Sequence, residues 1–233
     1  MKKTVLFFLI AMATMMVSCN KTTQVNEQKE SIEAQTSLEV SAVRTALVLA
    51  KYGYEVESAS ALIEAANILA STPTQSLPTI IQTGEENANE ADKTEKTALT
   101  PENILKDARG WAEGDANLLA LADKVQAKLD VKAEGTRGAV GGPQSATGTV
   151  YANSYVCFDV KFRANEIGEV FVMGDGDTDL DLYLYDDHGN LITSDTDYTD
   201  DCYVEFYVYE TSYFRIKIIN RGKVYNNFLL FTN

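Results

Sequence analysis

Hydrophobic residues recur at three- and four-residue spacing over roughly the first half of the chain, the period of a helix that buries one face. Four such segments occur between residues 36 and 130. The last three each begin at a residue that favours a helix N-cap, namely Ser58, Thr100 and Asp115. We therefore predict a small bundle of about four helices over residues 36–130, with the apolar stripes as its core.

Three segments lack this period. Residues 19–35 are polar, and we predict that they form a tether. Residues 73–98 include a run of glycine, glutamate and asparagine, and we predict a flexible loop there. Glycines gather between residues 131 and 148, which indicates a glycine-rich linker. No Gly-Lys-Ser/Thr follows these glycines, so they are not a phosphate-binding loop.

After the linker, apolar and polar residues alternate, which is the period of a strand with one buried face. Seven short strands are predicted, around residues 156–162, 170–172, 180–184, 191–192, 204–208, 214–218 and 228–230. Ten of the twelve tyrosines lie in the same part of the chain, and tyrosine is common in strands. We predict an antiparallel β-sandwich over residues 149–233 and an α+β multidomain protein overall.

The first residues have the pattern of an export signal. Two lysines precede Val5–Val17, an apolar run of 13 residues, whereas a membrane-spanning helix takes about 20. The run ends in Met16-Val17-Ser18-Cys19, which resembles the bacterial lipobox. This resemblance implies a signal peptide over residues 1–18, cleavage before Cys19, diacylglycerol on the Cys19 thiol and an acyl group such as palmitate on the new amine. Several acyl chains anchor a protein firmly in a membrane.

The same resemblance implies a place in the bacterial cell envelope. In lipoproteins of this type, aspartate directly after the lipidated cysteine favours retention at the inner membrane. Asn20 stands there instead, so we expect an outer-membrane lipoprotein. The sequence leaves open whether the protein faces the periplasm or the cell surface.

A second resemblance lies in roughly the last 80 residues. The run Asp-Leu-Tyr-Leu-Tyr-Asp at residues 181–186, the Gly189-Asn190 turn and the strand Tyr213–Ile218 resemble a bacterial pre-peptidase C-terminal domain. The resemblance implies a jelly-roll-like, non-catalytic β-sandwich that aids secretion, folding or binding, and some relatives bind calcium or collagen. No peptidase domain precedes the sandwich in this sequence, so a role in peptidase maturation does not follow directly.

The formal net charge of −14 limits the classes of partner. An acidic surface repels nucleic-acid phosphates and anionic lipid head groups, so we predict that the protein does not bind nucleic acid. The same charge is compatible with calcium, with basic partners, or with solubility alone.

Aspartates in the predicted sandwich form two clusters that are candidate calcium ligands. Asp177, Asp179 and Asp181 alternate along one predicted strand, so their carboxylates share a face about 7 Å apart, where a hard cation would relieve their repulsion. Asp195 and Asp197 belong to a second cluster in the following loop. A calcium site requires the fold to bring both clusters together. The alternative is a solvated face whose aspartates accept hydrogen bonds from turn backbone.

Two cysteines of the predicted sandwich lie in a compartment where disulfides are permitted. Alternation places Cys202 on the face of Val204 and Phe206, whereas Cys157 lies opposite Phe158. The sequence leaves their pairing open.

Motifs of catalysis are absent from the sequence. The sole histidine, His188, falls in a predicted hairpin turn, and no Gly-x-Ser-x-Gly, Cys-x-x-Cys or His-Glu-x-x-His occurs. We therefore expect a protein that is not an enzyme. Tyr183 and Tyr185 are candidate binding residues for a sugar or a protein, with ordinary sheet packing as the alternative.

Together these patterns predict a lipid-anchored, non-enzymatic cell-envelope protein whose β-sandwich is a binding or scaffolding module. Cys19 attaches it to the membrane, and its partner is an envelope protein or a glycan. Two alternatives remain open: an accessory or maturation factor for a separate exported hydrolase, and a carbohydrate-binding module.

Overall fold

A computed structural model describes residues 21–72, 74–83, 98–130 and 142–233, with only the backbone described for residues 21–37. Cys19, the predicted signal peptide and most of the predicted glycine-rich linker lie outside the described residues. No helix in the described part of the chain is both long enough and apolar enough to cross a membrane.

Four helices precede the sandwich in the described chain: α1 (Lys21–Glu55), α2 (Ala59–Ala70), α3 (Pro101–Trp111) and α4 (Ala116–Leu129). The three predicted N-caps are confirmed. Ser58 accepts a hydrogen bond from the backbone N–H of Ala61, Thr100 from that of Asn103, and Asp115 from those of Asn117 and Leu118. Each cap therefore satisfies a donor that the first helical turn leaves free.

The prediction of a polar tether over residues 19–35 is wrong for residues 21–35, because α1 begins at Lys21. This stretch contains neither proline nor glycine, and many of its residues are glutamine, glutamate, lysine and alanine, which have high helix propensity. A helix without an apolar stripe shows no hydrophobic period, so periodicity alone does not detect it.

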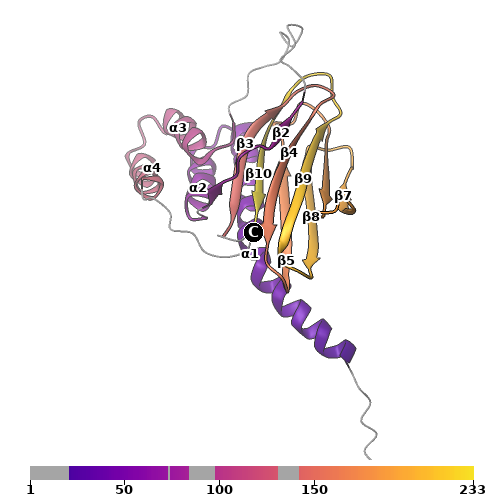
Figure 1. The fold of residues 1–233 in the computed structure, drawn as a ribbon. Helices are drawn as coiled ribbons and strands as arrows, with labels where there is room; N and C mark the ends of the chain where they lie inside the picture. The colour runs from indigo at the N-terminus through magenta and orange to yellow at the C-terminus, as the bar shows by residue number, and fades with distance from the viewer. Residues whose placement is uncertain (1–20, 73, 84–97, 131–141) are drawn as a thin grey trace, which may run out of the picture.

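Within the described residues, ten strands form two five-stranded sheets (Figure 1). The helix-side sheet has the order β1 (Gln75–Ser76), β3 (Gln144–Val150), β10 (Asn226–Thr232), β5 (Glu166–Met173) and β8 (Asp201–Val208). The outer sheet has the order β2 (Ile81–Gln82), β4 (Tyr155–Phe162), β9 (Ser212–Asn220), β6 (Leu180–Tyr185) and β7 (Leu191–Asp195). All pairs are antiparallel except β1 with β3.

All seven predicted strands are confirmed, and three further strands were not predicted. The strands β1 and β2 correct part of the predicted flexible loop 73–98, and Leu77 between them is buried in the sandwich core. Each has only two residues, too few to show alternation. The strand β3 begins inside the predicted linker, because its small residues give no apolar pattern.

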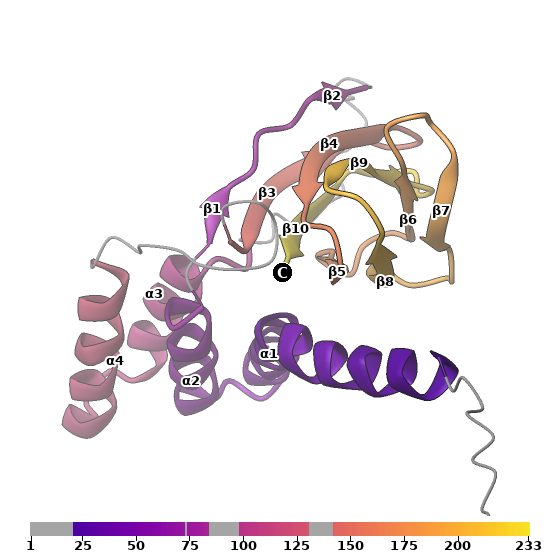
Figure 2. The ribbon, with the colours of Figure 1, turned by 60° about the horizontal axis from the view of Figure 1, so that its bottom comes forward.

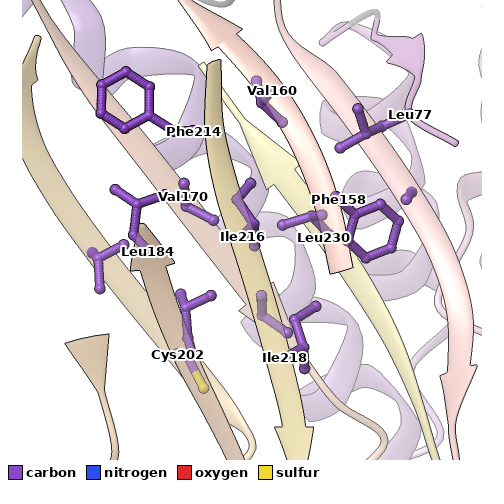
Figure 3. Close-up of a cluster of buried hydrophobic side chains, with 14 of the residues drawn as sticks. Leu77, Phe158, Val160, Val170, Leu184, Cys202, Phe214, Ile216, Ile218 and Leu230 are labelled. Carbon is purple, nitrogen blue, oxygen red and sulfur yellow. The ribbon is translucent and has the colours of Figure 1, made fainter. Parts of the chain in front are cut away.

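The sandwich core consists of the inward-facing residues of both sheets (Figure 3). In the outer sheet these are alternate residues such as Phe158, Leu184 and Ile216, all fully buried. Because side chains alternate across a strand, the residues between them face outward from the sandwich.

The helices pack on the outward face of the helix-side sheet. Helix α1 contacts β5 and β10, and Phe171, Met173, Leu229 and Phe231 of these strands belong to the hydrophobic core of the helices. Helix α2 packs against α1, α3 and α4. The helices and the outward face of the helix-side sheet therefore share a second core, although a glycine-rich segment separates the two parts in the sequence. The outer sheet faces away from the helices (Figure 2).

A buried carboxylate lies at this contact between α1 and the sheet. Glu169 of β5 is 2% exposed and accepts a hydrogen bond from the hydroxyl of Tyr203. The Arg44 guanidinium of α1 lies over the rings of Phe171 and Tyr203, 5.5 and 4.7 Å from their centres. Burial is the largest cause of the raised pKa of Glu169, which the Tyr203 hydrogen bond only partly offsets.

Candidate binding site

A groove of about 670 Å³ lies on the outward face of the outer sheet. This volume falls in the usual range of ligand sites, about 300–1,000 Å³. Strands β4 and β9 supply most of the lining, and the hairpin between β6 and β7 forms one side. The lining residues are Ile81, Tyr155, Cys157, Asp159, Tyr185, Asp186, Asp187, His188, Gly189, Tyr213, Phe214, Arg215 and Lys217.

The strand register aligns these outward residues in rows. Asp159 of β4 pairs with Arg215 of β9, which pairs in turn with Tyr185 of β6. In the next row, Lys217 lies between Cys157 and Tyr183. Directly opposed side chains on one face are about 5 Å apart, so each row forms a continuous polar and aromatic surface.

The positive charges of the groove have fixed partners. Arg215 donates from Nε and Nη2 to the two carboxylate oxygens of Asp159, each at 2.8 Å. These hydrogen bonds raise the pKa of Arg215. The Lys217 Nζ lies 4.1 Å from the centre of the Tyr155 ring, which is the geometry of a cation–π contact. The side chains at the centre of the groove are thus held by one another.

The hairpin side of the groove is ordered by Asp186. Its Oδ1 accepts hydrogen bonds from the backbone N–H groups of His188 and Asn190, and its Oδ2 accepts one from the Asn190 side chain. The Asn190 side-chain hydrogen bond is the main reason that the pKa of Asp186 is lowered. Gly189 has φ +83°, a backbone conformation that residues with a side chain rarely adopt, so this position of the turn favours glycine. As predicted, His188 lies in an exposed turn.

Asp187 binds two neighbours with different oxygens. Its Oδ2 accepts a 2.6 Å hydrogen bond from the Ser212 hydroxyl, and its Oδ1 lies 2.7 Å from His188 Nδ1. In a serine nucleophile triad the histidine lies between the serine and the acid. Here the acid lies between the serine and the histidine, so these contacts order the turn and do not form such a triad.

The two predicted binding tyrosines have different surroundings. Tyr185 is half-buried and lines the groove. Tyr183 stacks on Tyr185, with ring centres 6.4 Å apart, but is not part of the lining. The Tyr183 hydroxyl donates to Asp181 and accepts from Arg221. Tyr183 therefore packs against the Tyr185 ring without lining the groove itself.

Five outward-facing charged and aromatic residues on β4 and β9 line the groove and were not identified from the sequence. A signal is present in hindsight, because each alternates with the inward-facing residues of a predicted strand. They are Tyr155, Asp159, Tyr213, Arg215 and Lys217.

The first predicted calcium cluster does not lie along one strand, because β6 begins only at Leu180. Asp177 and Asp179 precede the strand, so the prediction that Asp177, Asp179 and Asp181 alternate along it is wrong. Asp181 is buried, and Arg221 Nε donates to it at 2.6 Å. Arg221 thus supplies positive charge where a cation was expected.

The second cluster does lie close to the first. The pKa of Asp179 is raised by burial and then by the charges of Asp181 and Asp197. Asp195 accepts a hydrogen bond from the Tyr203 backbone N–H, and Asp197 accepts from Thr199. Among the described residues, only Asp186, Asp187 and His188 bring three metal-ligating atoms within 4.8 Å of one another. Calcium binding by the two clusters stays a prediction.

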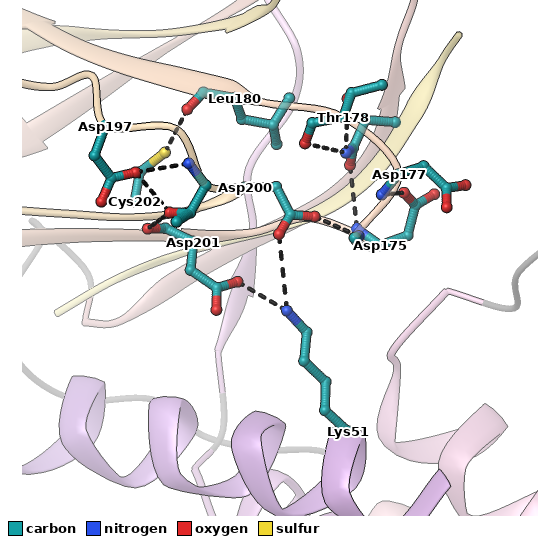
Figure 4. A network of polar contacts seen from close by, with 12 residues as sticks. Lys51, Asp175, Asp177, Thr178, Leu180, Asp197, Asp200, Asp201 and Cys202 are labelled. Carbon is teal, nitrogen blue, oxygen red and sulfur yellow. Dashed lines mark hydrogen bonds and ion pairs between the residues drawn. The ribbon is translucent and has the colours of Figure 1, made fainter. Parts of the chain in front are cut away.

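Acidic residues of the loops also contact the helices. Lys51 of α1 lies 3.0 Å from an Asp201 carboxylate oxygen and 3.8 Å from one of Asp200 (Figure 4). The Asp200 carboxylate also accepts a hydrogen bond from the Gly176 backbone N–H. These contacts connect the loops before β6 and β8 to the helical part, on the side away from the groove lining.

Both described cysteines are free and buried. Cys157 lies on the floor of the groove, and burial raises its pKa, which disfavours the reactive thiolate. Cys202 lies in the sandwich core and donates to the Leu180 carbonyl oxygen. Their placement on opposite faces agrees with the alternation of the sequence.

No protein-family model and no curated protein matches the chain. Solved structures match parts of it. A mitogen derived from Yersinia pseudotuberculosis is 21% identical, with a TM-score of 0.31, over 40% of this chain and 85% of that chain. The pre-peptidase C-terminal domain of a Bacillus anthracis collagenase is 7% identical, with a TM-score of 0.33, over 38% and 87%.

A third solved structure of this group is the Aeromonas hydrophila periplasmic inhibitor of g-type lysozyme. It is 11% identical, with a TM-score of 0.32, over 42% of this chain and 91% of that chain. The β-sandwich of this protein is established by its own strand pairing. The resemblance of its last 80 residues to a pre-peptidase C-terminal domain stays a prediction.

Proposed function

We propose that this chain is a lipid-anchored, non-enzymatic protein of the bacterial cell envelope that binds a ligand in the groove of its outer sheet. One observation carries the proposal of a binding site. The groove lies on the sheet that faces away from the helices, and its centre combines half-buried tyrosines with a fixed ion pair. Ligand sites typically combine aromatic walls with a few oriented polar groups.

The anchor is proposed from the lipobox residues that end at Cys19. Helix α1 begins two residues later and has 35 residues. Its N-terminal part extends away from the sandwich (Figure 1). At 1.5 Å per residue, residues 21–37 extend about 25 Å. A helix in this position would hold the groove away from the lipid, which is the role that we expected of the polar tether.

The test compares groove variants of the full-length protein in an envelope pull-down. Wild type, Tyr185→Ala and Arg215→Ala are purified in detergent, immobilised and exposed to solubilised envelope of the producing bacterium. Tyr198→Ala is the matched control, because Tyr198 is 96% exposed and does not line the groove.

We expect wild type and Tyr198→Ala to retain the same envelope component, and both groove variants to lose it. Equal retention by all four proteins would show that binding occurs elsewhere on the molecule. Circular dichroism melts of each variant separate a lost ligand contact from a lost fold.

A further inference from the structure

Among the described residues, β9 in the groove floor offers a ligand no free hydrogen-bonding edge. Strand β9 pairs with β4 on one side and with β6 on the other, whereas β2 pairs only with Val156 and Cys157 of β4. A peptide that adds to a sheet needs an unpaired strand edge. Recognition over β9 is therefore left to side chains, which argues against a peptide that adds as a strand beside β9.

Three tyrosines supply aromatic surface at separate points of the groove. Tyr155 comes from β4, Tyr185 from β6 and Tyr213 from β9. Tyr155 and Tyr185 are half-buried, and Tyr213 is 56% exposed. A tyrosine combines an apolar ring with a polar hydroxyl, so it suits a ligand that has both apolar faces and hydroxyl groups.

The ion pair beside Tyr185 supplies both donors and acceptors. A guanidinium has five N–H donors, and the two bonds to Asp159 leave three of those on Arg215 for a ligand. The Asp159 carboxylate retains acceptor capacity, because its oxygens have further lone pairs. Neighbouring sugar hydroxyls, each both a donor and an acceptor, match such a pair.

The charges of the groove nearly cancel. Asp159, Asp186 and Asp187 face Arg215 and Lys217 across a lining with no other acidic or cationic residue except His188. The whole chain carries −14, which repels anionic ligands before they reach the groove. The three carboxylates already accept hydrogen bonds from Arg215, Asn190 and Ser212, so none of them is left without a partner for a cationic ligand. A ligand without net charge fits this balance.

We propose that the groove binds a neutral glycan. Sugar rings lie on the face of Tyr155 opposite Lys217 and on the face of Tyr185 opposite Tyr183, and their hydroxyls exchange hydrogen bonds with Arg215 and Asp159. This inference rests on the proposed function, because it takes the groove as the binding site, and it adds the chemical class of the ligand.

The experiment screens the full-length protein in detergent against an array of neutral and carboxylated oligosaccharides and then titrates the best neutral binder by calorimetry. We expect saturable binding of a neutral oligosaccharide. Tyr185→Ala and Tyr155→Ala should weaken it at least tenfold, whereas Tyr185→Phe, which keeps the ring, and Tyr198→Ala should change it less than threefold. A carboxylated analogue of the same oligosaccharide should bind more weakly than the neutral form.

Two outcomes would overturn this inference. One is that no neutral oligosaccharide binds, and the other is that its binding is insensitive to Tyr155→Ala and Tyr185→Ala. If the envelope pull-down still depends on the groove, the proposed function stands and the ligand is an acidic glycan or a protein surface. If the pull-down is also insensitive to the groove variants, both proposals fail. Melting curves identify any variant that is unfolded, and Arg215→Lys, which should weaken binding about tenfold, then serves in its place.

Discussion

Arg215 of β9 and Asp159 of β4 form two parallel hydrogen bonds of 2.8 Å across the strand pair at the centre of the groove. The guanidinium and carboxylate planes match in this arrangement, which lysine cannot reproduce. The two side chains are 45% and 28% exposed, so solvent screens their attraction. The pair therefore contributes little to stability, and its value lies in orienting donors and acceptors toward a ligand.

This relationship predicts that Arg215→Lys separates binding from stability. The variant keeps the charge and loses the two-point geometry. We expect the free energy of unfolding to change by less than about 1 kcal/mol, as for exposed ion pairs. Affinity for the groove ligand should fall about tenfold. Urea denaturation and calorimetry measure the two quantities, with Arg163→Lys, an exposed position outside the lining, as control. A large loss of stability with unchanged affinity would contradict the interpretation.

The rows that build the groove explain why it was not found in the sequence. Alternation identifies the inward residues of each strand, and those predictions are confirmed by Phe158, Leu184 and Ile216. Alternation does not say which strands are neighbours. Asp159 and Arg215 are 56 residues apart and meet only because the sheet order places β4 beside β9. Strand order depends on how the whole core packs, so it is not a local property of the sequence.

The N-caps show the opposite case. Ser58, Thr100 and Asp115 bind donors two or three residues ahead, so the information is local and the helix starts were predicted correctly. The packing of α1 on β5 was not predicted, since Phe171 and Met173 face outward from the sandwich and only the contact with the helix buries them. The residues of β5 that alternate with Phe171 and Met173 point inward and fill the sandwich core.

Glu169 makes stability depend on pH. Burial raises its pKa in the folded protein, with the nearby acids Glu205 and Glu39 adding to the rise and Tyr203 and Arg44 opposing it. The folded state therefore binds this proton more tightly than the unfolded chain. The stabilisation from the protonated form is fully present below the unfolded pKa and is lost as the pH rises through the folded pKa.

Glu169→Gln, which mimics the protonated side chain, should therefore gain stability relative to wild type as the pH rises from about 4 to 7. Urea denaturation at several pH values, followed by the fluorescence of Trp111, the sole tryptophan, measures the difference. Glu210→Gln, which removes an exposed acid that does not affect the pKa of Glu169, is the control. Parallel stability curves for wild type and Glu169→Gln would be inconsistent with a raised pKa.

The calcium prediction has a direct test at Asp179. Among the described residues, one of its oxygens is buried without a hydrogen-bond partner, and burial, followed by the charges of Asp181 and Asp197, raises the pKa of Asp179. If calcium binds there, calcium chloride raises the melting temperature of wild type, a chelator reverses the rise, and Asp179→Asn abolishes it. Asp123→Asn, on the helical part, should respond as wild type does. A melting curve that calcium and chelator leave unchanged would exclude the site.

Phe171 tests whether the helices and the sandwich unfold together. It belongs to a strand of the sandwich, yet it packs in the hydrophobic core of the helices. Phe171→Ala should cost about 3–5 kcal/mol, as for a buried phenylalanine. Because the helices and the sandwich share this core, they should unfold together in wild type. The unfolding midpoint measured by Trp111 fluorescence in α3 should then equal the midpoint measured from the strand signal in circular dichroism. Separate midpoints in wild type would show two independent units.

Cys19 determines the last prediction, which concerns the anchor. If the lipobox resemblance holds, Cys19→Ser prevents lipidation, because serine has no thiol to receive diacylglycerol. The protein expressed in a bacterium should then leave the detergent phase of a phase separation, and its intact mass should lack the acyl groups. Cys157→Ser, which changes a buried thiol of the sandwich, should partition as wild type does. Wild-type protein that lacks acyl mass and stays in the aqueous phase would rule out the anchor. The groove proposal would be unaffected, since the residues that line the groove all belong to the sandwich and its β2 strand, and not to the anchor.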